Sequence, residues 1–177
     1  GSGRSIESYS MFEELVKCGD LMEQYGGHPM AAGLSIKEEN VEEFRRRLNE
    51  NCTLTEKDLM PKIVIDVPMP VSYINKELVE EISLLEPFGK GNTKPIFAQK
   101  GLRVLSSRVL GKNRNVAKLQ LSDSTGCVME AVYFGEADEF VNQVKNSSSI
   151  AVTYYPEINR YQGRETLQIV IRNYLTE

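Results

Sequence analysis

The stretch Tyr25-Gly26-Gly27-His28-Pro29-Met30-Ala31-Ala32-Gly33 decides how this chain is interpreted, because it holds the only histidine among 177 residues. Two glycines precede the histidine and small residues follow it, so little bulk surrounds the imidazole. Glycine also adopts φ > 0 readily and lets a phosphate or another backbone come close. The pattern predicts a binding loop, although a tight turn that leads into a buried strand would also account for it.

The segments around this stretch indicate a small α/β domain. Apolar residues recur at helical spacing from Ile6 to Cys18, and Ser5 is a candidate N-cap. Downstream we expect, in order, a buried strand, an amphipathic helix, one helical turn and a second strand. These elements are predicted over residues 31–36, 38–49, 55–60 and 62–67.

Three consecutive arginines, Arg45 to Arg47, stand toward the end of the amphipathic helix. Such a cluster could bind DNA. Glutamates that precede it, such as Glu42 and Glu43, could instead form (i, i+4) ion pairs with it on a solvated helix face. The sequence alone leaves both interpretations open.

The net charge of −4 hides a change of sign along the chain. Residues 1–94 carry 11 basic and 17 acidic side chains, whereas residues 95–177 carry 10 basic and 8 acidic ones. Local basic clusters are therefore a better guide to partners than the total charge.

Neither a membrane anchor nor a disulfide framework is predicted. No apolar run approaches the ~20 residues that span a bilayer, and the first ten residues do not resemble a signal peptide. We therefore expect a cytoplasmic protein. The three cysteines, Cys18, Cys52 and Cys127, are far apart and lack the spacing of a zinc site.

The second half of the chain alternates apolar and polar residues, as strands do. Five strands are expected over residues 102–110, 116–121, 127–134, 150–155 and 166–174, with a helix over 136–144. Three strands, a helix and two strands is the element order of an OB-fold, a small Greek-key barrel that often binds single-stranded nucleic acid. A helix capped by Asn75 and the loop Glu86-Pro87-Phe88-Gly89-Lys90-Gly91-Asn92 precede the barrel.

Taken together, Gly1-Ser2-Gly3-Arg4-Ser5-Ile6, the Gly-Gly-His stretch, the Pro-Phe-Gly loop and the barrel resemble the RecJ family of single-strand-specific DNA exonucleases. Gly-Gly-His alone also resembles other DHH-superfamily phosphoesterases and alanyl-tRNA synthetases, whereas the barrel and the loop favour RecJ. Alternatively, Gly1-Ser2-Gly3 is a remnant of cloning.

The resemblance implies an α+β fold in three parts. The C-terminal portion of a DHH-associated substrate-binding domain, of α/β type, would span residues 1–67. A linker helix and loop would span residues 68–94, and a five-stranded OB-fold residues 95–177.

The resemblance also implies that a catalytic domain is missing. The DHH domain of the family, whose Asp and His residues hold two divalent metal ions (Mn or Mg), would precede this region. The chain contains no Asp-His-His, and a single histidine cannot build such a site. We therefore expect a C-terminal fragment that holds no cofactor and is inactive by itself.

In the first domain the resemblance assigns two groups of site residues. Ser2 and Arg4 match the motif that holds the 5′-terminal phosphate of DNA, and Gly26, Gly27 and His28 match the loop that faces the scissile phosphate. An arginine fork, a hydroxyl and glycine amides suit phosphate oxygens. His28 would stabilise charge on the transferring phosphoryl group. The alternative for the arginine is an ion pair with Glu7 or Glu13.

In the barrel, a single-strand track needs cations for the phosphates and flat side chains for the bases. Several basic and tyrosine residues near the two hairpins qualify, although some of the tyrosines must be core. We expect the contacts to come from Arg108, Lys112, Arg114, Arg160, Tyr161 and Arg164.

The sequence thus favours the substrate-binding C-terminal region of a RecJ-like 5′-to-3′ single-strand DNA exonuclease, which would act in DNA repair and recombination. Two alternatives stay open. One is a non-catalytic module that binds single-stranded DNA or recruits replication and repair proteins. The other is part of a DHH-family phosphoesterase for oligonucleotides or dinucleotides, against which the long barrel track argues.

Overall fold

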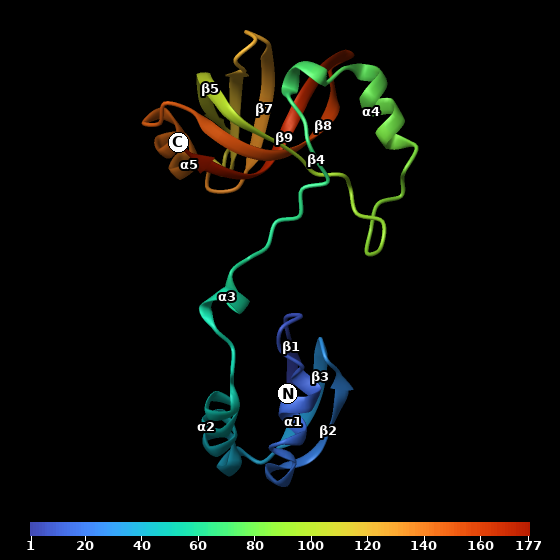
Figure 1. Cartoon of the computed structure of the whole chain (residues 1–177), viewed down its shortest axis with the longest axis vertical. Helices are drawn as coiled ribbons and strands as arrows, with labels where there is room; N and C mark the ends of the chain where they lie inside the picture. The colour runs from blue at the N-terminus through green and yellow to red at the C-terminus, as the bar shows by residue number, and fades with distance from the viewer. The chain divides into compact units, whose positions relative to one another are not determined.

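The computed structural model describes all 177 residues and is mixed α+β, as the sequence indicates. Figure 1 shows its helices and strands along the chain. Two compact units divide it, residues 1–62 and residues 63–177. No helix has both the length and the apolar character needed to cross a membrane.

The first unit is a three-stranded antiparallel sheet with helices beside it. Strand order is β1-β3-β2, so β3 lies in the middle. Leu15, Cys18 and Ala32 are its buried apolar residues. The elements are β1 (Ser2–Arg4), α1 (Met11–Val16), β2 (Met22–His28), β3 (Ala31–Ile36), α2 (Val41–Asn51) and α3 (Glu56–Leu59), with 3₁₀ turns at Gly19–Leu21 and Glu38–Asn40.

The Gly-Gly-His stretch is not a loop, contrary to the prediction. Its residues form the end of β2, and Gly26, Gly27 and His28 all pair with β3. Only Pro29 and Met30 lie between the two strands. Glycine is a turn signal in sequence, but here its lack of a side chain allows close pairing of two strands.

The first helix is shorter than predicted, since it spans Met11–Val16 and leaves residues 6–10 and 17–18 outside it. Its N-cap is Ser10, whose hydroxyl accepts a hydrogen bond from the Glu13 N–H at 3.4 Å. The predicted cap, Ser5, instead donates from its hydroxyl to the Tyr9 carbonyl.

The three arginines of α2 are paired with acidic side chains. Arg46 contacts Glu43 and Glu50, each at 2.6 Å, and Arg47 contacts Glu43 at 2.8 Å and Asp20 at 2.9 Å. The remaining pair joins Arg45 and Glu42. These contacts favour the solvated-face interpretation over a DNA patch.

The second unit is a closed five-stranded barrel. Its strands follow the order β5-β6-β7-β9-β8, and pairing of β5 with β8 closes the ring. Only β7 and β9 are parallel within the ring. The elements are β5 (Phe97–Leu110), β6 (Val116–Ser122), β7 (Val128–Phe134), α5 (Ala137–Lys145), β8 (Ile150–Tyr161) and β9 (Arg164–Thr176).

Residues 68–94, which we expected to link two domains, belong to the barrel unit. Val71 and Ile74 lie in its core, and the Val71 N–H donates to Gln99 Oε1 at 2.7 Å. Asn75 caps the next helix as predicted, by accepting from the Leu78 N–H at 2.8 Å. The elements of this segment are β4 (Val67–Pro68), a 3₁₀ turn (Val71–Tyr73) and α4 (Lys76–Ser83).

The strand predicted over residues 62–67 is reduced to β4, which pairs in parallel with the start of β5. Before it, Ile63, Val64 and Ile65 are exposed rather than part of a sheet. An Ile-Val-Ile run has high strand propensity, but propensity yields a strand only where a partner strand supplies hydrogen bonds.

Candidate functional site

One face of the first unit gathers the residues that the sequence singled out. Two rows of paired residues cross the sheet, Arg4–Ala31–His28 and Ser2–Gly33–Gly26. Paired residues on neighbouring strands point to the same side of a sheet, as do residues two apart along a strand. Ser2, Arg4 and His28 therefore share one face, which we call the Arg4–His28 face.

The spacing of this face suits the phosphate groups of a nucleic-acid strand. Neighbouring strands lie about 4.7–4.9 Å apart, so the backbones of Arg4 and His28 are separated by about 9–10 Å across the small Ala31. Both side chains are exposed. A guanidinium and an imidazole that start at this separation can contact neighbouring phosphate groups of one strand.

Arg4 forms no ion pair with Glu7 or Glu13, so that alternative is wrong for this structure. Its Nη1 donates to the Gly3 carbonyl at 2.9 Å and to Ser2 Oγ at 3.3 Å. The Arg4 guanidinium thus contacts no carboxylate and lies beside Ser2, the residue predicted to bind the 5′-terminal phosphate together with it.

The glycines of this region differ in what they do. At Gly27, where φ is +155°, an added Cβ would lie 2.3 Å from the Ala31 carbonyl oxygen. At Gly26 it would meet nothing within 4 Å, and at Gly33 only the Gly1 carbonyl oxygen at 3.8 Å. The fold therefore requires Gly27, whereas Gly26 and Gly33 leave the Arg4–His28 face open to a ligand.

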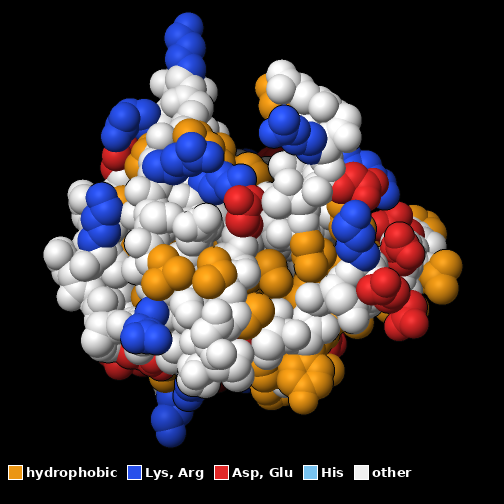
Figure 2. Space-filling view, turned by 90° about the horizontal axis from the view of Figure 1, so that it is seen from above, with side chains coloured by type: hydrophobic (Ala, Val, Ile, Leu, Met, Phe, Trp, Pro, Cys, Tyr) orange, Lys and Arg blue, Asp and Glu red, His pale blue; other side chains and the backbone are white.

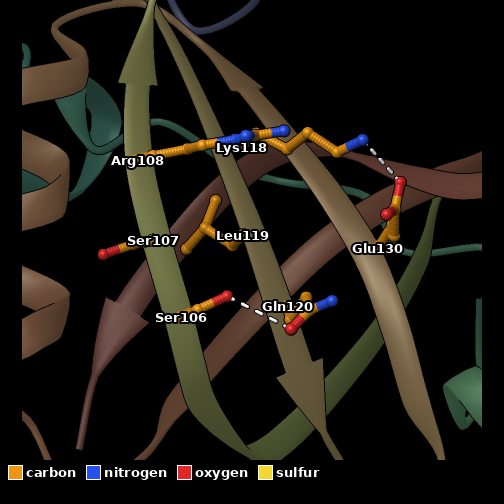
Figure 3. A pocket seen from close by; sticks show the side chains of 7 residues that line it. All are labelled: Ser106, Ser107, Arg108, Lys118, Leu119, Gln120 and Glu130. Atoms are coloured by element: carbon orange, nitrogen blue, oxygen red, sulfur yellow. Dashed lines mark hydrogen bonds and ion pairs between the residues drawn. The ribbon is translucent and has the colours of Figure 1, made fainter.

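The second candidate surface is the outer face of β5, β6 and β7. A pocket of about 260 Å³ lies on it, and its lining residues come from all three strands (Figure 3). Arg108 pairs with Lys118 across β5 and β6, and the Lys118 Nζ contacts Glu130 Oε2 at 2.6 Å. The remaining lining residues are Ser106, Ser107, Leu119 and Gln120.

The predicted barrel cations fall into two groups. Arg108, Lys112 and Arg164 form no ion pair. The other two are neutralised: Arg114 Nε donates to Asp138 Oδ2 at 2.7 Å, and Arg160 Nε donates to Glu165 Oε1 at 2.9 Å. Exposed pairs contribute only about 0–1 kcal/mol, so an incoming phosphate can compete for these arginines.

The pKa values of the two carboxyl groups reflect this pairing. Hydrogen bonds from Lys76 and Arg160 lower the pKa of Glu165 to about 2. The Arg114 guanidinium likewise lowers the pKa of Asp138. Both carboxylates are therefore charged at neutral pH and offset part of the positive charge of the hairpins.

The three tyrosines of β8 differ in burial, and one of them is core, as the sequence predicts for some of them. Tyr154 is core, and its hydroxyl donates to the Met69 carbonyl. The ring of Tyr155 carries the Lys94 ammonium, whose Nζ lies 3.9 Å from the ring centroid. Tyr161 is exposed at the β8–β9 hairpin. Of these three, only Tyr161 offers a free ring.

Figure 2 shows how charge is spread over the face of the molecule seen from above. Lys and Arg side chains surround exposed hydrophobic side chains, while acidic side chains gather at one side of this view. A surface that alternates cations and apolar groups suits a ligand with both phosphates and flat rings.

Lys118 is a pocket residue that we did not select from the sequence. The sequence nevertheless contains a feature that indicates Lys118: the hairpin turn over residues 111–115 sets a register in which Lys118 lies opposite Arg108. Charges that face each other across a hairpin can be identified once the turn length is known.

The chain offers no group of three or more His, Cys, Asp or Glu side chains that could hold a metal ion. The single exposed histidine, His28, has no such partners. The residues present thus do not fit a two-metal centre.

Comparison with known proteins decides the family. A protein-family model that describes the RecJ OB domain matches residues 65–173 of the sequence. The chain belongs to the RecJ family. A second family model, the DHHA1 domain, matches residues 1–53 and covers the whole Arg4–His28 face.

Curated RecJ proteins are similar over nearly the whole chain. The single-stranded-DNA-specific exonuclease RecJ of Bacillus subtilis is 33% identical over 175 residues, and that of Escherichia coli is 28% identical over 179. Each comparison covers 98% of this chain, but only 22% and 30% of those proteins. The chain therefore spans less than a third of the length of these relatives.

Solved structures confirm the fold. RecJ from Thermus thermophilus, solved in complex with Mg²⁺ and with Mn²⁺, superimposes on the whole chain with a TM-score of 0.78 at 22% identity. The match covers 27% and 25% of those chains. The chain thus has the fold of the corresponding part of those structures.

Proposed function

We propose that this chain is the substrate-binding region of a RecJ-like exonuclease that degrades single-stranded DNA from its 5′ end. The enzyme would act in the cytoplasm in DNA repair and recombination. Phosphodiester hydrolysis would belong to a metal-binding DHH domain of the whole protein, because the residues of this chain cannot hold two metal ions.

The row Arg4–Ala31–His28 is the observation that carries the proposal. Arg4 and Ser2 would hold the 5′-terminal phosphate by charge-assisted and neutral hydrogen bonds. His28, from the opposite edge of the same row, would donate to a phosphoryl oxygen on which charge develops. Gly26 would let the DNA backbone lie close to the sheet, whereas Gly27 is needed for the close pairing of β2 with β3.

The barrel would hold the DNA further from its 5′ end. Arg108, Lys112 and Arg164 supply free cations, Arg114 and Arg160 supply cations that must leave their carboxylates, and Tyr161 supplies a ring. Contacts to phosphates and base faces carry no base-edge code, so we expect little sequence preference.

The test is His28→Ala in the full-length enzyme. The loss of one preorganised transition-state contact should lower kcat by about 10²–10³ while DNA binding changes little. His28 is exposed at a strand end, so the variant should fold. A loss confined to binding would assign His28 to substrate anchoring instead, and an unchanged kcat would exclude it from the site.

A protein-recruiting role for the barrel is supported by a separate observation. An apolar cavity of about 230 Å³ lies on the barrel unit and is lined by Ile63, Ile65, Ala98, Ala151 and Leu175, among others. Titration of the chain with single-stranded DNA, with duplex and with candidate repair proteins would separate the two roles. The RecJ OB match disfavours the remaining alternative, a phosphoesterase for dinucleotides, because such a short substrate needs no barrel track.

A further inference from the structure

Phe134 stands out among the large side chains of the barrel because it is last in β7 and 60% exposed. Its neighbour Tyr133 points the other way and packs against Phe140, with 4.3 Å between the ring centroids. Phe134 belongs neither to the hydrophobic core of this unit nor to the side chains packed against that core. An aromatic ring left in solvent at a fixed strand position is a candidate for ligand contact.

The pairing register places this ring beside cations. Phe134 lies in a row with Val116 and Leu110, and the next row on the same face contains Val132, Lys118 and Arg108, so that Lys118 is diagonal to Phe134. Rows two residues apart along a strand are separated by about 6.5–7 Å. The outer face thus presents an apolar ledge directly next to the cations of the pocket in Figure 3.

The backbone that carries Phe134 is held on two sides. Phe134 pairs with Val116 in the β6–β7 ladder, and the following Gly135 donates its N–H to the Asn115 carbonyl at 3.0 Å. Gly135 has φ +155°, and an added Cβ there would lie 2.8 Å from the Tyr133 hydroxyl. The ring therefore projects from a rigid position, and little conformational entropy would be lost when a ligand covers it.

We propose that Phe134 is a stacking platform for one unpaired nucleobase, while Arg108 and Lys118 contact the adjoining phosphates. This inference rests on the proposed function and adds a residue to its DNA track. The cations favour a polyanion as the ligand. The exposed ring favours a polyanion whose base faces are accessible, as they are in single strands and not in duplexes. Lys118 would exchange Glu130 for phosphate.

The experiment compares two probes on the whole chain. One is an oligothymidylate of about 16 nucleotides, the upper site size of an OB-fold, and the other is an abasic strand of the same length. Phe134→Ala should weaken binding of the oligothymidylate by about five- to a hundredfold and leave binding of the abasic strand unchanged. The matched control is Tyr73→Ala, which removes another exposed ring of the same unit and should change neither affinity.

A second variant tests stacking directly. The chain contains no tryptophan, so Phe134→Trp introduces a single fluorophore at the platform. Its emission should be quenched by the oligothymidylate and not by the abasic strand, with affinity retained.

Three outcomes would contradict the proposal. Undiminished binding of the oligothymidylate by Phe134→Ala would exclude the platform alone, as would equal loss for both probes. Failure of the unaltered chain to bind either strand would contradict the proposed function, and the platform with it. If Phe134→Ala abolished binding of a repair protein while DNA binding was unchanged, the ledge would be a protein-docking surface.

Discussion

Gly27→Ala should destabilise the first unit far more than Gly26→Ala, although the two glycines are adjacent. At Gly27 a methyl group would overlap the Ala31 carbonyl, at 2.3 Å, and φ is +155°. A non-glycine residue in this backbone region costs about 1–3 kcal/mol, and forcing atoms into an occupied space costs a further ~1–3 kcal/mol. The expected loss is therefore about 2–6 kcal/mol.

That loss is large for a unit of this size. At roughly 0.05–0.15 kcal/mol per residue, a domain of about 60 residues is stable by about 3–9 kcal/mol. Gly27→Ala should therefore leave the first unit largely unfolded or close to unfolding at 37 °C. Gly26→Ala meets no atom within 4 Å, and its free energy of unfolding should change by about 0.5 kcal/mol or less.

Denaturant titration followed by backbone amide NMR signals measures this difference, and the signals of the barrel serve as an internal reference. Signals from β2 and β3 should be lost at lower denaturant in Gly27→Ala than in Gly26→Ala. Gly26→Ala should nevertheless weaken binding of 5′-phosphorylated single-stranded DNA, because its methyl group lies on the Arg4–His28 face. Equal stability of the two variants would refute the assignment of Gly27 to the fold and Gly26 to the ligand.

Three further predictions concern the barrel and the chain as a whole. Arg108→Ala should reduce the slope of log affinity for single-stranded DNA against log salt by about 0.7, whereas Arg114→Ala, which loses a cation already paired with Asp138, should reduce it less. Asp123→Asn should destabilise the barrel by about 1–3 kcal/mol in thermal unfolding at neutral pH, because the buried carboxylate accepts from the Thr125 and Cys127 N–H groups at 2.9 and 3.0 Å. The hydroxyl and N–H of Thr125 and the N–H of Cys127 lower the pKa of Asp123. The stability that Asp123 contributes is therefore complete above the unfolded-state pKa of about 4 and is lost as pH falls through the lower folded-state pKa. Thermal unfolding of Asp123→Asn should accordingly depend less on acid pH than that of the unaltered chain. The chain alone, incubated with Mn²⁺ and 5′-phosphorylated DNA, should leave the DNA intact, and shortening that survives repurification and disappears in His28→Ala would overturn this expectation.

The sequence predicted the barrel better than the first unit, for physical reasons. Strands β5 to β9 alternate strongly and are separated by clear turns, so their order and the helix between them were correct. Their lengths were underestimated, because residues such as Phe97 and Arg160 pair with neighbouring strands that a local pattern does not reveal. In the first unit, the sequence predicts a loop at Gly-Gly-His because glycine signals turns more often than strand ends.

The sequence predicts individual residues of the candidate site but not which of them lie together on one surface. Arg4 and His28 are candidates from the sequence alone, and the strand over residues 31–36 is predicted as well, but no local pattern reveals that β1 and β2 pair with its two edges. The sequence pattern also does not show the pairing of Arg114 with Asp138, which is 24 residues away and comes near it only in the fold. The pairing of Arg160 with Glu165 depends on the register of the β8–β9 hairpin. Phe134 was overlooked because an aromatic residue in a strand is usually core.

The burial of Val71 and Ile74 in the barrel core has a consequence for how the protein is made. Synthesis proceeds from the N-terminus, so these two residues leave the ribosome long before β8 and β9, which complete the ring around them. Strands β1, β2 and β3 pair with one another within residues 1–62, so their pairing needs no strand that is translated later. The barrel must wait for its last strand, and during that interval Val71 and Ile74 are exposed to chaperones and proteases.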